Sequence, residues 1–250
     1  MEMLMETPPD PAHGQPDAVP ARSRAHLQHL GRRPYEEVRQ IQQVWLDARL
    51  SGRCPDTLLL LEHDPVFTIG RRTRDEHWRT HLTAIADAGI PIHHTDRGGS
   101  VTYHGPGQLI GYPIMRLRPP FCGPRRYVHL LEETLLRTIA EFGIAPFRRE
   151  GLHGVWVPGV EAPMKIAAVG VRIVHGVTLH GFSLNVCPDL VPFDWIVPCG
   201  IEGCRSTSLA SLLDRSVSCD IVAEGLARHF AAVFGLTWYS DVALSPDPPH

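Results

Sequence analysis

The sequence has no long apolar runs and almost no lysine. No stretch of about eighteen consecutive apolar residues occurs in the 250 residues, which excludes a membrane-spanning helix. A formal net charge of -3 argues against nucleic acid as the main partner. The 24 basic residues comprise 23 arginines and a single lysine, Lys165. The chain is therefore expected to act neither on nucleic acid nor within a membrane.

The six cysteines show no paired spacing. Cys199 and Cys204 are too far apart for a CxxC motif and have no matching ligand pair, so we expect no structural zinc. A chain of this length does not need disulfides, which favours a reduced, intracellular protein. The acidic, proline-rich N-terminus differs from signal and mitochondrial targeting peptides, and we expect a cytoplasmic location.

Length and composition predict one folded domain with a tail at each end. Residues 1–24 are rich in proline, alanine, histidine and aspartate without periodicity, a composition that does not repay the entropy of ordering. Residues 25–240 contain the apolar patterns needed for a core, and residues 241–250 are again proline-rich. We expect a disordered tail, a catalytic domain and a second flexible tail in these ranges.

Helical and extended patterns alternate along the chain. Apolar residues at steps of three and four predict helices over 35–50, 82–88, 127–142 and 216–234. Short apolar runs predict strands over 56–62, 66–70, 108–114, 154–157, 165–174 and 177–186. The last two are expected to form a hairpin at His175-Gly176. Strands in the middle and helices around them predict a single mixed-sheet α/β or α+β domain with flanking helices.

A glycine-rich segment, residues 97–108, separates two of these strands. It reads Arg97-Gly98-Gly99-Ser100-Val101-Thr102-Tyr103-His104-Gly105-Pro106-Gly107-Gln108. Four glycines and a proline exclude a helix and disfavour a strand interior. Glycines also allow the backbone to approach a ligand closely. We predict a binding loop with polar side chains at its margins.

Three arginines, Arg71, Arg72 and Arg74, follow the predicted strand 66–70. Such a cluster is consistent either with a solvated turn or with a docking patch for an acidic partner, because opposite charges raise encounter rates. The sequence leaves both interpretations open.

Cys199 and Lys165 are the residues best suited to covalent chemistry. Cys199 lies between Pro198 and Gly200. A buried, inert thiol is the commonest fate of cysteine, but a helix starting near Thr207-Ser208-Leu209 would favour the thiolate. An ammonium about 4 Å from the sulfur, at an effective dielectric of about 20, is worth roughly 4 kcal/mol, which is about three pKa units. Lys165 precedes an otherwise apolar strand and is our candidate for that ammonium, although a lysine at a strand end can equally extend to water.

Taken together, these segments resemble the octanoyltransferases of lipoate biosynthesis. The matching blocks, in order, are the glycine loop 97–108, the segments 154–157 and 165–172, the segment 181–186, the segment 198–201 and Thr207-Ser208-Leu209. The resemblance covers nearly all of the predicted domain. Met164 and His153 depart from residues that are common in the family.

The resemblance implies a fold similar to the catalytic domain of biotin and lipoate protein ligases. It assigns Cys199 as the acylated nucleophile and Lys165 as the residue that lowers the pKa of the thiol. The residues implied to line the acyl and pantetheine channel are Arg97, Gly98, Gly99, Ser100, Val101, Thr102, Tyr103, His104, Ala168, Val169, Gly170, Gly181, Phe182 and Ser183.

The implied reaction is transfer of an octanoyl or lipoyl group from an acyl carrier protein thioester to a lysine of a lipoyl domain. Acceptors would be the lipoyl domains of 2-oxoacid dehydrogenases and the glycine cleavage H protein. Cys199 would carry the acyl group as a thioester intermediate, with the loop backbone and His104 stabilising the oxyanion. We expect no metal or other cofactor.

Three other functions are compatible with the sequence. The first is octanoyl transfer between two lipoyl-type domains, which differs only in the donor. The second is an ATP-dependent lipoate or biotin ligase, which activates the acid as an adenylate and needs no nucleophilic cysteine. The third is a non-catalytic module that binds carrier proteins, for which Cys199 and Lys165 would be dispensable.

Overall fold

The computed structural model describes residues 23–78, 82–119, 123–201 and 203–239. A central mixed sheet has the strand order β12-β1-β2-β6-β10-β9-β8-β7, with β11 added beside β9. Its strands are β1 (Ser23–Arg33), β2 (Asp56–His63), β6 (Gln108–Ile114), β7 (Phe147–Arg149), β8 (Leu152–Val157), β9 (Met164–Val174), β10 (Val177–Asn185), β11 (Arg205–Ser206) and β12 (Leu236–Trp238).

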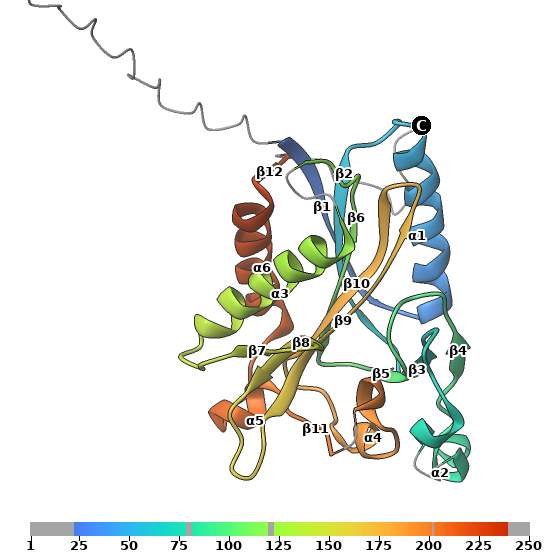
Figure 1. The fold of residues 1–250 in the computed structure, drawn as a ribbon, viewed down its shortest axis with the longest axis vertical. Coiled ribbons are helices and arrows are strands. Elements are labelled where there is room, and N and C mark those ends of the chain that lie inside the picture. The colour runs from blue at the N-terminus through green and yellow to red at the C-terminus, as the bar shows by residue number, and fades with distance from the viewer. Residues whose placement is uncertain (1–22, 79–81, 120–122, 202, 240–250) are drawn as a thin grey trace, which may run out of the picture.

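Helices cover both faces of this sheet, as Figure 1 shows. Helices α3 (Pro124–Ala140) and α6 (Cys219–Phe234) pack against each other and against one face, while α1 (Tyr35–Leu50) packs against β6 and β10 on the other. The remaining helices are short: α2 (Leu82–Asp87), α4 (Val191–Asp194), α5 (Leu209–Leu213) and the 3-10 turns η1 (Asp75–Trp78) and η2 (Pro198–Gly200). The fold is thus a three-layer arrangement of helix, sheet and helix.

Strand β2 is apolar at consecutive positions because helices cover both faces of the sheet around it. Leu58 and Leu60 join the core under α3 and α6, whereas Leu59 and Leu61 join the core under α1. Successive side chains of a strand point to opposite faces, so a strand covered on both faces needs apolar residues at every position.

A second, three-stranded sheet holds the glycine loop beside the main sheet. Its order is β4-β3-β5, with β3 (Val66–Ile69), β4 (Ile92–His94) and β5 (Thr102–His104). A separate apolar cluster, which includes Phe67, Trp78 and Tyr103, fills the space beneath it. The middle of the predicted loop is therefore a short strand, a difference from the sequence prediction. Pairing with Val66–Thr68 outweighs the local preference of the surrounding glycines.

The long hairpin β9–β10 forms as predicted. His175 and Gly176 connect its strands with φ of 47° and 80°, the positive values that two-residue hairpin turns require. The predicted helices over 35–50, 82–88, 127–142 and 216–234 and the predicted strands are all present, with boundaries shifted by a few residues.

Several elements were not predicted. Strand β1 begins at Ser23, so the tail predicted for residues 1–24 overlaps it by two residues; residues 1–22 and 240–250 lie outside the described ranges. The short strands β4, β7, β11 and β12 also have no sequence pattern that we identified. Within the described ranges, none of the helices is long and apolar enough to cross a membrane.

Candidate functional site

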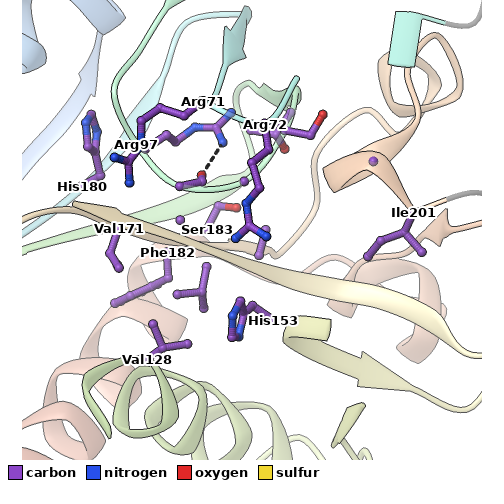
Figure 2. A pocket seen from close by; sticks show the side chains of 18 of the residues that line it. Arg71, Arg72, Arg97, Val128, His153, Val171, His180, Phe182, Ser183 and Ile201 are labelled. Atoms are coloured by element: carbon purple, nitrogen blue, oxygen red, sulfur yellow. Dashed lines mark hydrogen bonds between the residues drawn. The ribbon is translucent and has the colours of Figure 1, made fainter. Parts of the chain in front are cut away.

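A cavity of about 690 Å³ lies where the glycine loop meets strands β9 and β10. This volume is within the range of roughly 300–1,000 Å³ that is typical of small-molecule sites. Most of its lining residues come from the loop after β3, the glycine loop, the start of α3, the hairpin β9–β10 and the segment 197–201, and others come from α1, β6 and the start of β8. Figure 2 shows this cavity from close by.

The two walls of the cavity differ in chemistry. Val128, Val171 and Phe182 contribute apolar side chains from α3, β9 and β10, while Arg71 and Arg72 come from the loop after β3. In Figure 2 the apolar side chains lie on one side of the strands and the arginines on the other. A ligand with an apolar chain and a charged group would therefore satisfy both walls.

Lys165 lies at the start of β9 and lines the cavity. Its residue exposure is 5%, and its Nζ is 5.4 Å from the centroid of the Trp156 ring, a cation–π distance. A Cβ at Gly154 would lie 2.9 Å from the Lys165 Cε. Glycine at position 154 therefore leaves the space that the lysine stem occupies.

Cys199 belongs to η2, and the segment on either side of it lines the same cavity as Lys165 through Val197, Gly200 and Ile201. After this segment the polypeptide runs back beside β9, where Ser206 of β11 pairs with Lys165 in parallel register. The tertiary structure thus brings Lys165 and the segment that contains Cys199 to the same cavity.

His77 is a residue that sequence reasoning missed. Its backbone carbonyl accepts a 2.7 Å hydrogen bond from the Val197 N–H. Its Nδ1 accepts hydrogen bonds from the Arg74 N–H at 3.1 Å and from the Ser100 hydroxyl at 2.6 Å. With Nδ1 accepting, the neutral ring carries its proton on Nε2. A Cβ at Gly200 would lie 3.1 Å from that Nε2, so His77 adjoins the Cys199 segment. No sequence motif links residues 77 and 199.

His104 lines the cavity and belongs to a buried hydrogen-bond chain behind it. The Gln108 amide donates through Nε2 to Asn185 Oδ1 at 2.8 Å, so its Oε1 accepts from His104 Nδ1 at 2.7 Å. The other His104 nitrogen then accepts, and Thr68 Oγ1 lies 3.4 Å from it. Burial lowers the pKa of His104 to about 3. The ring is neutral and its only N–H is already engaged, so it has no proton to offer an oxyanion.

The same hydrogen-bond chain continues to Lys165. Asn185 Nδ2 donates to the Thr207 carbonyl at 2.9 Å, and the Thr207 N–H donates to the Lys165 carbonyl at 2.9 Å. Buried polar groups that satisfy one another fix a unique arrangement. This chain therefore fixes the strand that carries Lys165 relative to the glycine loop.

Arg97 is buried and anchors the glycine loop. Its guanidinium donates to the Thr68 carbonyl at 2.7 Å, to Thr68 Oγ1 at 2.8 Å and to the Gly98 carbonyl at 3.0 Å. A Cβ at Gly70 would lie 2.4 Å from the Gly99 carbonyl oxygen, which is closer than any real contact. The glycines here allow backbone to pack against backbone.

His180 also lines the cavity, and Figure 2 shows His180 and Ile201 on opposite sides of the view. It has φ of 55° within β10, an unusual conformation for a residue other than glycine. Its Nε2 bonds Asp96 Oδ1 at 2.8 Å, and this hydrogen bond lowers the pKa of Asp96. Arg172 also pairs with Asp96.

The structure places most of the predicted binding residues around one cavity. Those that line it are Arg97, Gly98, Gly99, Ser100, Thr102, His104, Lys165, Ala168, Val169, Gly170, Gly181, Phe182 and Ser183. Val101 and Tyr103 instead pack in the apolar cluster beneath the second sheet, because alternate residues of a strand face opposite sides. Arg71, Arg72 and Arg74, whose role the sequence left open, line the cavity as well.

Comparison with known proteins gives the family. The profile of the lipoyl protein ligase A/B catalytic domain matches residues 34–231. An octanoyltransferase of Thermobifida fusca (strain YX) is 46% identical over 220 residues, covering 86% of this chain and 91% of that relative. An octanoyltransferase of Mycobacterium leprae (strain Br4923) is 45% identical over 223 residues, covering 87% and 92%.

Solved structures confirm the predicted fold. A bipartite lipoate protein ligase from Thermoplasma acidophilum superposes with a TM-score of 0.67 at 17% identity, covering 90% of this chain and 89% of that chain. A lipoate-protein ligase A bound with ATP gives 0.64 at 18% identity, covering 90% of each chain. Sequence identity, residue coverage and fold agree that this chain belongs to the octanoyltransferase family, within the lipoyl protein ligase A/B catalytic domains.

Proposed function

We propose that this protein transfers an octanoyl group from an acyl carrier protein thioester to a lysine of a lipoyl domain. The acyl group is carried between the two as a thioester on Cys199. Relatives of about 45% identity that are octanoyltransferases support the reaction. The acyl-enzyme, the role of Lys165 and the two protein partners are our inference.

One observation carries the proposal: Lys165 and the segment that contains Cys199 line the same cavity. An ammonium close to a thiol favours the thiolate, and the thiolate is the form that attacks a thioester. The apolar wall formed by Val128, Val171 and Phe182 suits an acyl chain.

In the first half-reaction, the Cys199 thiolate attacks the carbonyl carbon of the donor thioester. A tetrahedral oxyanion forms and collapses, and the donor sulfur leaves as a thiolate. The Lys165 ammonium gives this thiolate its proton, so that the donor leaves as a thiol and Lys165 becomes neutral. We assign the stabilising hydrogen bond to the Nε2–H of His77, because the N–H of His104 is committed to Gln108.

In the second half-reaction, the amine of the acceptor lysine attacks the acyl-enzyme. An amide bond forms, the Cys199 thiolate leaves, and the amine proton passes to neutral Lys165, which returns the dyad to its starting state. An amide is more stable than a thioester, so the overall transfer proceeds without an energy source.

The test is intact mass measurement after mixing the protein with octanoyl carrier protein and no ATP. We expect a gain of one octanoyl group, removed by hydroxylamine and mapped to Cys199 by peptide digestion. Because Lys165 is the single lysine, a hydroxylamine-resistant adduct on it would be recognised at once and would contradict the proposal.

Matched variants sharpen the result. Cys199→Ser should not form the labile adduct, whereas Cys187→Ser, which alters an exposed free thiol, should form it at the normal rate. Activity that requires ATP and free octanoate would instead indicate a ligase. An octanoyl lipoyl domain that is a better donor than the carrier protein would indicate transfer between lipoyl domains.

A further inference from the structure

The cavity carries more positive charge than the acyl-transfer chemistry uses. Among the described residues, six cationic side chains line it against one carboxylate, that of Glu76: Arg71, Arg72, Arg74, Arg97, Arg125 and Lys165. The whole chain has a formal net charge of -3. The positive charge is therefore concentrated at this site, which favours an anionic ligand.

Three of these cations already have structural partners. Lys165 lies over Trp156, the guanidinium of Arg97 bonds Thr68 and Gly98, and Arg74 pairs with Glu76 at 3.3 Å.

Three others differ from them. Within the described part of the chain, the guanidinium groups of Arg71, Arg72 and Arg125 form no hydrogen bond or ion pair with the protein. Their donors remain for a ligand or for water.

The backbone that carries two of these arginines is held in place. The Arg71 N–H donates to the Arg97 carbonyl at 3.1 Å, and the Arg72 N–H donates to the Gly99 carbonyl at 3.0 Å. The Thr73 hydroxyl closes the turn by donating to the Gly70 carbonyl at 2.9 Å. Figure 2 shows Arg72 extending from this turn toward the side of the cavity on which His153 lies. The turn thus presents both guanidiniums from a fixed position.

We propose that Arg71 and Arg72, together with Arg125 from the start of α3, bind a phosphate ester on the acyl donor. This inference rests on the proposed function, because it requires that the donor be a thioester. The apolar wall takes the acyl chain, and the arginine wall takes the anion on the arm that bears the sulfur. Guanidinium groups suit phosphate because their planar N–H donors match two phosphate oxygens at once.

The experiment compares two small donors that differ only in the phosphate: S-octanoyl-4′-phosphopantetheine and S-octanoyl-pantetheine. For the natural sequence, kcat/KM of acylation should be higher for the phosphorylated donor by roughly tenfold or more, the effect of one charge-assisted hydrogen bond. In the double variant Arg71→Gln, Arg72→Gln this ratio should fall several-fold, with Arg125 left as the remaining guanidinium. Arg53→Gln, which removes an exposed arginine after α1, should keep the original ratio.

A binding measurement avoids dependence on the variants. Calorimetry with unacylated 4′-phosphopantetheine and pantetheine should show tighter binding of the phosphorylated form to the natural protein. Equal affinities, or a ratio that persists in the double variant, would overturn the assignment. Loss that occurs only with the intact carrier protein would mean that the arginines contact its acidic surface, which also overturns it. Failure of all donors to acylate Cys199 would refute the proposed function, while calorimetry would still test the phosphate site.

Discussion

Two groups of polar residues at the cavity differ in whether their side chains have hydrogen-bond partners in the protein. His104, Gln108 and Asn185 lie behind the glycine loop and satisfy one another in the buried hydrogen-bond chain. Arg71 and Arg72 lie at the surface of the cavity and have no partner for their guanidiniums within the described residues. The first group stabilises the fold and fixes the site, and the second is left for a ligand. Polar residues in and behind the wall of one cavity can therefore serve different purposes.

The largest expected effect concerns buried histidines behind the loop. Burial lowers the pKa of His104 to about 3 and of His63 to about 4, from 6.5 in the unfolded chain. Between pH 6.5 and these lowered pKa values, the unfolded chain binds more protons than the folded protein. The free energy of unfolding is therefore greatest above about pH 6.5 and falls as the pH drops toward 4. Each group contributes up to ~1.4 kcal/mol per pH unit.

Urea unfolding at several pH values measures this effect. The pH dependence should be smaller in His63→Phe than in the natural protein, because one of the two titrating rings is removed. His29→Gln, at an exposed position, serves as the control and should leave the dependence unchanged. A His63→Phe protein with the same pH dependence as the natural protein would contradict the assignment of a neutral, buried ring.

The second effect tests the hydrogen-bond chain itself. Gln108→Leu leaves the His104 Nδ1–H and Asn185 Oδ1 buried without partners, and each such group costs about 1–3 kcal/mol. The free energy of unfolding should fall by roughly 2–6 kcal/mol. Gln43→Leu, which removes one exposed hydrogen bond to Asp47, should change it by less than about 0.5 kcal/mol. If the two variants lost equal free energy of unfolding, the hydrogen-bond chain would add nothing to stability.

The third effect concerns Lys165, whose carbonyl belongs to the hydrogen-bond chain and whose side chain is one of the cavity cations. In Lys165→Met the thiol of Cys199 should return toward an ordinary pKa of about 8.5, at which only about 3% is thiolate at pH 7. Acylation should slow by about 30-fold at pH 7 and recover as the pH rises above 8.5. Rates of acylation by mass spectrometry between pH 6 and 9.5 test this. A loss of the same size at every pH would assign Lys165 a purely structural role.

The smallest expected effect concerns the cavity wall that carries Arg71 and Arg72. Glu76 is the carboxylate among the described residues that line the cavity, and it pairs with Arg74 in an exposed position. Exposed pairs contribute little to stability, so Glu76→Gln should leave unfolding unchanged within about 0.5 kcal/mol. Removing its negative charge should raise kcat/KM for the phosphorylated donor by about twofold, with no gain for the unphosphorylated one. Equal gains would mean that charge near the cavity does not select the donor.

Much of the site could be predicted from local sequence. Glycine density in 97–108 predicted a binding loop, and Gly98 and Gly99 line the cavity. The close packing of backbone on backbone involves Gly70, which lies outside that segment. The isolated Lys165 and the Pro198-Cys199-Gly200 segment were also visible in sequence. His77 was not, because its relation to the Cys199 segment depends on a contact between two loops. Strand β1 was missed because polar residues interrupt its apolar positions.

The sequence by itself determined the elements: the periodic helices, the apolar strands, the hairpin at His175-Gly176 and the glycine loop. These follow from interactions between neighbouring residues, which periodicity and turn chemistry report. Only the tertiary structure decided which side chains share the cavity. It brought the Cys199 segment back to Lys165 through β11, turned Tyr103 into the core, and closed both nitrogens of His104 into hydrogen bonds. Such contacts join residues far apart in the chain, so no local pattern records them.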